Sequence, residues 1–132
     1  MYRVLIADDE SIIREGIKCL FDWESLGYTI AGEAANGETA YQQILALQPD
    51  IVLLDIRMPG MDGLEEARCI RALERSDAKT VPIIAVTANL FQQDISACSN
   101  AGMTGFLSKP LNVEQLLTMI AQQTRKGEQS HE

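Results

Sequence analysis

The chain has 132 residues, which suits one compact domain, and its 46% hydrophobic and 23% charged residues are typical of globular proteins. A formal net charge of -8 argues against a surface that binds nucleic acid, because such a surface needs basic residues to neutralise phosphates. Three scattered cysteines without a CxxC pair, no apolar leader and no apolar stretch of about 20 residues predict a cytoplasmic protein that does not cross a membrane.

The single histidine, His131, lies in a polar tail. A Ser-His-Asp triad needs a buried histidine, so that kind of catalytic site is excluded. A zinc site is also disfavoured, because the cysteines and the histidine do not cluster along the chain.

The first half of the chain alternates between strand-like and helix-like segments. Tyr2–Ala7 is a short apolar run that predicts a strand, and apolar residues over 13–21 then recur at helical spacing. Tyr28–Ala34 predicts a second strand. Asn36 is a favourable N-cap for a second helix, which ends before Pro49.

The middle of the chain contains the most apolar run. Ile51–Leu54 is aliphatic throughout, as expected of a central parallel strand that is buried on both faces, and it ends at Asp55. A turn-rich segment follows. Asp62 and Glu65 have the spacing of a capping box, which predicts a third helix.

The last part of the chain repeats the alternation. Pro82–Val86 predicts a fourth strand that ends at Thr87, and apolar residues over 91–98 indicate a fourth helix. Thr104–Leu107 predicts a short fifth strand, and Asn112 with Gln115 is expected to cap a last helix. The chain becomes polar at about residue 125, so we expect a domain over residues 1–124 and a tail over residues 125–132.

Five strand–helix units in succession predict a single doubly wound α/β domain. Short right-handed crossovers then give a five-stranded parallel sheet with helices on both faces. In such open sheets, ligands bind beyond the carboxyl ends of the strands. Five side chains with suitable chemistry follow strand ends and are expected to converge there: Asp8, Asp9, Asp55, Thr87 and Lys109.

These side chains form a chemically consistent set. Carboxylates that lie close together repel one another unless a cation sits among them, and oxygen ligands suit Mg²⁺. An aspartate can act as the nucleophile that accepts a phosphoryl group, which a lysine ammonium and a threonine hydroxyl can then contact. The pattern therefore predicts phosphoryl transfer to Asp55 with the help of Mg²⁺.

Each of these residues also has a plain structural interpretation. Asp8 and Asp9 fit the first turn of a helix as caps, and Asp62 fits a cap of the third helix. Asp55 alone fits a solvated turn residue, and Thr87 fits a strand end. Lys109 fits a surface cation, and Phe106 fits a core aromatic. The functional interpretation rests on their coincidence at strand ends.

At these residues the sequence resembles the receiver domains of response regulators, the phosphoacceptor domains of two-component signalling. The resemblance covers roughly residues 2–123. Four motifs carry it: Val4–Glu10, Leu53–Gly63, Ala85–Ala88 and Phe106–Pro110. It implies a flavodoxin-like strand order 2-1-3-4-5.

The resemblance also implies roles for matching residues. Asp55 is expected to be the phosphoacceptor, and the Mg²⁺ ligands are expected to be Asp8, Asp9, Asp55 and the backbone carbonyl of Arg57. Thr87 and Phe106 are expected to form a switch pair. Further expectations are that Lys109 contacts the phosphoryl group, that its peptide bond to Pro110 is cis, and that Arg57 and Asn89 tune the lifetime of the aspartyl phosphate.

The expected phosphodonor is a histidine kinase or a hybrid kinase, and the expected target is an output domain or a separate protein. A homodimer is possible through the fourth helix, the fifth strand and the fifth helix. Arg14–Gly16 and Asp22–Gly27 resemble regulators with a C-terminal AraC-type DNA-binding domain, whereas Pro82–Asn89 resembles receivers of hybrid kinases. No DNA-binding segment is recognised after residue 125, so we expect no direct contact with nucleic acid.

Three other functions remain open at this point. A phosphatase of the haloacid dehalogenase type also uses an aspartate nucleophile with Mg²⁺, but it places an acid two residues later, where this chain has Arg57. A flavodoxin-like FMN carrier needs a loop that accepts phosphate, and Asp8–Glu10 would repel one. A receiver that binds partners without phosphorylation would not need the complete acidic set. We therefore expect a switch rather than an enzyme.

Overall fold

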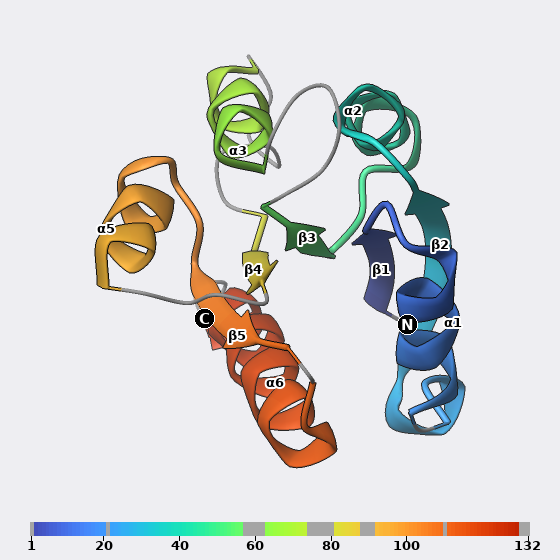
Figure 1. Ribbon diagram of the computed structural model, residues 1–132. Helices are drawn as coiled ribbons and strands as arrows, with labels where there is room; N and C mark the ends of the chain where they lie inside the picture. Colours follow the sequence, from blue (N-terminus) through green and yellow to red (C-terminus); the bar gives the residue numbers. More distant parts are fainter. Residues whose placement is uncertain are drawn as a thin grey trace.

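The computed structural model describes residues 2–20, 22–56, 63–73, 81–87, 92–109 and 111–129. Their strands form a parallel sheet in the order β2-β1-β3-β4-β5, as predicted (Figure 1). The strands are β1 (Tyr2–Ala7), β2 (Tyr28–Ala34), β3 (Ile51–Asp55), β4 (Ile83–Thr87) and β5 (Gly105–Ser108). The helices are α1 (Ser11–Cys19), α2 (Gly37–Leu47), α3 (Gly63–Ala72), α5 (Gln92–Asn100) and α6 (Val113–Gln129), with a short 3-10 helix η1 (Glu24–Leu26).

The sheet separates two apolar cores. Successive residues of a strand point to opposite faces. In β3, Val52 and Leu54 pack with α2, α3 and α5 on one face, whereas Ile51 and Leu53 pack with α1 and α6 on the other (Figure 1). All of β3 is buried, which explains why its sequence is aliphatic rather than alternating. Because helices pack on both of its faces, β3 holds its last residue, Asp55, in a fixed position.

Most predicted boundaries are confirmed. β1 and β2 have the predicted bounds, and β4 begins one residue later than predicted but ends at Thr87 as predicted. β5 begins and ends one residue later than predicted. Asn36 caps α2 by accepting a hydrogen bond from the Thr39 N–H at 2.8 Å. Asn112 likewise accepts from the Gln115 N–H at 3.1 Å. Asp62, the predicted cap of the third helix, lies outside the described residues.

Helix α6 continues past the point where the sequence becomes polar. It runs to Gln129, and the domain boundary at residue 124 stays a prediction. No helix in the described part of the chain combines the length and the apolar character that crossing a bilayer requires.

The run Asp22–Gly27 forms η1 and the approach to β2. Trp23 is buried, donates from its indole N–H to the Ile17 carbonyl at 3.1 Å and packs edge-on against the Tyr28 ring at 6.2 Å. Gly27 ends η1 with a φ of 92°, in the left-handed region that favours glycine. The Tyr28 hydroxyl meets the Thr124 hydroxyl of α6 at 3.1 Å. This cluster therefore ties α1, β2 and α6 together on one face.

A second tie joins the ends of two helices on the opposite face. The Arg71 guanidinium of α3 donates from Nε and Nη2 to the Gly102 carbonyl, just after α5, at 3.0 and 2.7 Å. Gly102 has a φ of 99°, which turns the chain toward β5. Both hydrogen bonds use the planar fork of arginine. They hold α3 and α5 together at the amino edge of the sheet.

Glu66 is an exception to the apolar lining of this face. It is fully buried on α3, and among the described residues neither carboxylate oxygen has a hydrogen-bond partner. Burial raises the pKa of Glu66 from 4.5 to about 7. A buried carboxyl group without partners destabilises the folded state, most strongly when it is ionised.

We therefore predict that Glu66→Leu stabilises the protein by roughly 1–3 kcal/mol at about pH 8, because leucine removes a buried polar group without leaving a cavity. The folded protein holds the Glu66 proton to a higher pH than the unfolded chain does. The wild-type protein therefore loses stability as the pH rises through the window from 4.5 to about 7. Urea unfolding at several pH values measures both effects.

Two variants control this measurement. Glu66→Gln keeps the shape and removes the charge, so it should abolish the pH-dependent part alone. Glu65→Gln alters an exposed neighbour on the same helix and should leave the pH profile unchanged. Equal pH profiles for wild type and Glu66→Gln would show that Glu66 is not the titrating group.

Candidate functional site

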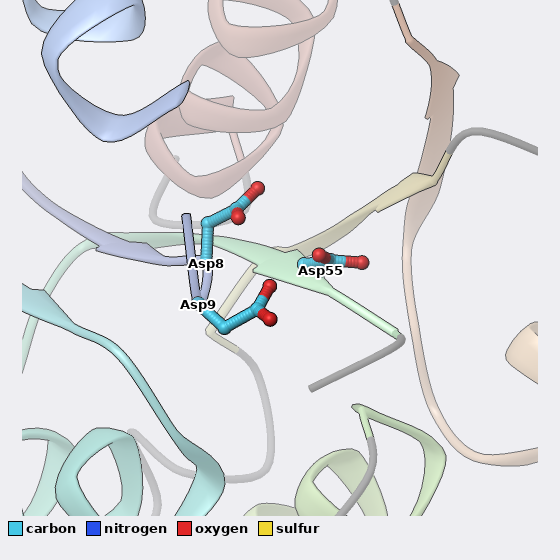
Figure 2. Close-up of side chains that lie close together, drawn as sticks. All are labelled: Asp8, Asp9 and Asp55. Atoms are coloured by element: carbon cyan, nitrogen blue, oxygen red, sulfur yellow. The ribbon is translucent and has the colours of Figure 1, made fainter. Parts of the chain in front are cut away.

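Three carboxylates meet at the carboxyl edge of the sheet. β1 and β3 are neighbours, with Ala7 paired to Leu54, so the next residues of each strand lie side by side. One oxygen from each of Asp8, Asp9 and Asp55 lies within 4.8 Å of the others (Figure 2). Asp8 and Asp55 are buried, whereas Asp9 is exposed. The predicted convergence of these three residues is therefore present.

Lys109 closes this cluster from the far side. It follows β5, and its Nζ lies 2.9 Å from Asp8 Oδ2 and 3.3 Å from Asp55 Oδ2. Its backbone N–H donates to the Thr87 carbonyl at 2.8 Å, which holds its backbone beside the end of β4. Burial opposes the charge of Lys109, but the hydrogen bond to Asp8 and the charge of Asp55 outweigh it and raise the pKa of Lys109.

Asp8 is held by its backbone as well as by its side chain. Its N–H donates to the Ala34 carbonyl of β2 at 3.0 Å, and its Oδ1 accepts from the Glu10 N–H at 2.9 Å. The N-cap of α1 is Glu10, whose side chain makes no capping hydrogen bond. The alternative that Asp8 or Asp9 serves as the N-cap of this helix is therefore wrong.

Thr87 and Phe106 lie on neighbouring strands. Thr87 is the fully buried last residue of β4 and pairs with Ser108 of β5. Phe106 pairs with Ala85, is partly buried, and packs against the core beneath α2, α3 and α5. Their expected movement as a switch pair stays a prediction. Arg57, Asn89 and Pro110 lie outside the described residues, so their expected roles, including the cis peptide at Pro110, stay predictions as well.

The donor set fits a hard divalent cation. Its oxygens come from three carboxylates, and Lys109 supplies a single positive charge toward two of them. Oxygen ligands of this kind, with one side open to water at Asp9, suit Mg²⁺. The cation would relieve the repulsion among the carboxylates that Lys109 alone offsets only in part.

The structure places one further residue, Arg14, next to the site. Arg14 of α1 donates from Nη1 to the Asp8 carbonyl at 2.6 Å. Its position, less than two helical turns after the acidic pair, was visible in the sequence. Its contact with Glu33 of β2 could not be seen in the sequence, because that contact depends on how α1 packs on the sheet.

Comparison with known proteins identifies the family. The sequence model of the response regulator receiver domain family matches residues 4–121 of this chain. The chain therefore belongs to the response regulator receiver domain family. Receiver domains are in general signalling switches rather than enzymes, so the phosphatase and the flavin carrier are set aside.

Individual relatives agree with this assignment. The chain is 38% identical over 120 residues to the transcriptional regulatory protein YesN of Bacillus subtilis, covering 91% of this chain and 32% of that protein. It matches the receiver domain of AraT from Geobacillus stearothermophilus with a TM-score of 0.83 and 30% identity, over 99% of this chain and 98% of that one.

A further match is the receiver domain of the sensor histidine kinase PA1611 of Pseudomonas aeruginosa PAO1. The TM-score is 0.81 and the identity 32%, over 93% of this chain and 97% of that chain, and that structure has a magnesium ion coordinated in its active-site cleft. The chain spans 32%, 54% and 53% of the length of the first curated relatives, which are longer regulatory proteins.

We predict that Lys109→Met destabilises the protein in the absence of divalent cations by roughly 1–3 kcal/mol, because Asp8 and Asp55 lose their ammonium partner in a buried position. Added Mg²⁺ should stabilise this variant more than it stabilises the wild type. Thermal unfolding with and without Mg²⁺ measures both effects. An equal Mg²⁺ response in the two proteins would contradict the expectation that Lys109 and the cation neutralise the same carboxylates.

Proposed function

We propose that this domain is a phosphorylation-activated switch in which Asp55 is the phosphoacceptor. The observation that carries the proposal is the placement of the Asp55 carboxylate, which lies 3.3 Å from the Lys109 ammonium and within 4.8 Å of carboxylate oxygens of Asp8 and Asp9. A nucleophile in this position has both a candidate cation site and a positively charged ammonium beside it. This is the arrangement that transfer of an anionic phosphoryl group requires.

The phosphodonor in this proposal is a phosphohistidine of a histidine kinase or a hybrid kinase. A lone pair of an Asp55 oxygen forms the new O–P bond while the N–P bond of the phosphohistidine breaks. The electron pair of the broken bond returns to the imidazole nitrogen, which takes a proton. The domain stores the phosphoryl group and catalyses only its own phosphorylation and dephosphorylation.

Asp8, Asp9 and Asp55 would hold Mg²⁺, together with the Arg57 carbonyl. When bound, Mg²⁺ neutralises phosphoryl oxygens as charge develops on them. Lys109 would keep its ammonium at the site and exchange its contact with Asp55 for one with a phosphoryl oxygen. Arg57 and Asn89 would tune how long the phosphoryl group persists.

The conformational response to phosphorylation would involve Thr87 and Phe106. The Thr87 hydroxyl would donate to the phosphoryl group, and the Phe106 ring, which lies one strand further along the sheet, would move inward. Phe106 also lines a groove between β5 and α6. The surface formed by α5, β5 and α6 would therefore report the phosphorylation state to an output domain, to a separate protein or to a second copy in a homodimer.

The charge of the chain and its family bear on its partners and its location. The net charge of -8 disfavours direct contact with nucleic acid, so we assign that task to a partner. Histidine kinases deliver phosphoryl groups on the cytoplasmic side of the membrane, and we place the domain there.

We predict that incubation with Mg²⁺ and acetyl phosphate adds one phosphoryl group to the wild type and none to Asp55→Asn, because an amide cannot act as the nucleophile. Intact-mass spectrometry measures the adduct. The matched control is Asp50→Asn, since Asp50 precedes β3 at the amino edge of the sheet and is exposed. An adduct that persists in Asp55→Asn, or none in the wild type, would refute the assignment.

We further predict that Thr87→Val leaves beryllofluoride binding intact but abolishes the conformational response, because valine keeps the shape of the buried side chain and lacks its hydroxyl. Hydrogen exchange of the backbone amides over residues 105–122 should change on binding in the wild type and stay constant in the variant. The same change in both proteins would rule out the hydroxyl as the trigger.

A further inference from the structure

The backbone carbonyl of Asp8 is held by a side chain of the following helix. β1 ends at Ala7, so the Asp8 carbonyl lies just beyond the last residue that pairs with β2. Arg14, on α1, donates to this carbonyl from Nη1 at 2.6 Å. The same short segment carries Asp9, the exposed member of the acidic cluster. Arg14 therefore acts on the backbone that sets the position of two of the three carboxylates.

The Arg14 guanidinium is itself fixed by Glu33 of β2. Arg14 Nε lies 3.2 Å from Glu33 Oε1, and the other oxygen of Glu33 accepts from Lys18 Nζ at 2.8 Å. The hydrogen bond from Lys18, aided by Arg14, lowers the pKa of Glu33 more than burial raises it, which keeps it ionised at neutral pH. The Arg14 side chain is 18% exposed, and its guanidinium contacts both Glu33 and the Asp8 carbonyl.

We infer that Arg14 is a positioning residue for the divalent cation at the Asp8–Asp9–Asp55 cluster. The inference rests on the proposed function, because it requires that the cluster binds Mg²⁺. Arg14 donates to the Asp8 carbonyl, not to a carboxylate of the cluster, and so acts on the geometry of the ligands. Groups that orient metal ligands without touching the metal commonly change its affinity by about tenfold or more.

The chemistry of arginine matters for this role. The planar fork donates from separate nitrogens to the Asp8 carbonyl and the Glu33 carboxylate at the same time. The Asp8 carboxylate, in turn, is tied to the Glu10 N–H. A displacement of the Asp8 backbone would therefore move the carboxylate as well. Loss of Arg14 should weaken cation binding more than it alters phosphoryl transfer once the cation is bound.

Lys18 offers a matched control within the same network. It lies on the same helix, one turn after Arg14, and it pairs with the same Glu33 carboxylate and with Glu15. Within the described part of the chain, Lys18 forms no hydrogen bond or ion pair with Asp8. Lys18→Met therefore removes one positive charge and one Glu33 contact, as Arg14→Met does. Lys18→Met also removes the exposed pair with Glu15, whereas only Arg14→Met removes the contact with the Asp8 carbonyl.

The experiment measures Mg²⁺ affinity by isothermal titration calorimetry for the wild type, Arg14→Met, Arg14→Lys and Lys18→Met. Arg14→Met should bind Mg²⁺ about tenfold more weakly than the wild type, whereas Lys18→Met should stay within about twofold. Arg14→Lys keeps the charge without the fork and should also bind more weakly. Circular dichroism shows whether Arg14→Met folds. If it does not fold, the comparison uses Arg14→Lys instead.

Phosphorylation by phosphoramidate over a range of Mg²⁺ concentrations provides a second readout. The Arg14 variants should need more Mg²⁺ but reach the wild-type rate at saturation. Equal Mg²⁺ affinity in the Arg14 and Lys18 variants would overturn the inference and leave Arg14 as a staple between α1 and β2. So would a reduced rate at saturating Mg²⁺ with unchanged affinity.

These outcomes separate the inference from the proposed function. If the wild type binds Mg²⁺ and forms the adduct while the Arg14 variants match Lys18→Met, only the role of Arg14 fails. If the wild type binds no Mg²⁺, both fail together.

Discussion

The ion pairs of Lys109 with Asp8 and Asp55 join the ends of three strands that are far apart in the sequence. Without a positive charge there, two buried carboxylates would face each other across neighbouring strands, and burial would make their repulsion costly. The ammonium offsets this repulsion in the folded chain, but it supplies one positive charge to a cluster of three carboxylates. Lys109 thus lowers the repulsion that opposes folding, while the cluster keeps a net negative charge that favours a divalent cation.

This balance of charges depends on how rigidly the backbone holds Asp55 and Asp8. β3 is buried along its whole length between two apolar cores, so Asp55 has a fixed origin, and Asp8 is held at its N–H, its carbonyl and its carboxylate. Buried polar groups are normally satisfied in this way. Glu66, on the helix after β3, is not satisfied among the described residues. The fold therefore tolerates the energetic cost of a buried carboxyl group on the helix that follows β3.

Much of this architecture could be predicted from the sequence because its causes are local. Aliphatic runs define the strands, Asn36 and Asn112 mark helix starts, and the polar residue after each strand end falls at the carboxyl edge in any parallel sheet. The contact of Arg14 with Glu33 and Asp8 could not be predicted, since it depends on the rotation of α1 against β2. The burial of Glu66 escaped prediction for the same reason: Glu65 and Glu66 are identical in type, and only packing decides which one faces the core.

The tie between Arg71 and Gly102 has a mechanical consequence. It joins the carboxyl-terminal ends of α3 and α5 at the amino edge of the sheet, at the opposite edge from the acidic cluster. Sliding one helix along the other would break both hydrogen bonds, whereas rotation about this point would preserve them. A rotation of the two helices about this point would therefore produce its largest displacement at their amino-terminal ends, toward the carboxyl edge of the sheet where Asp55 and Thr87 lie.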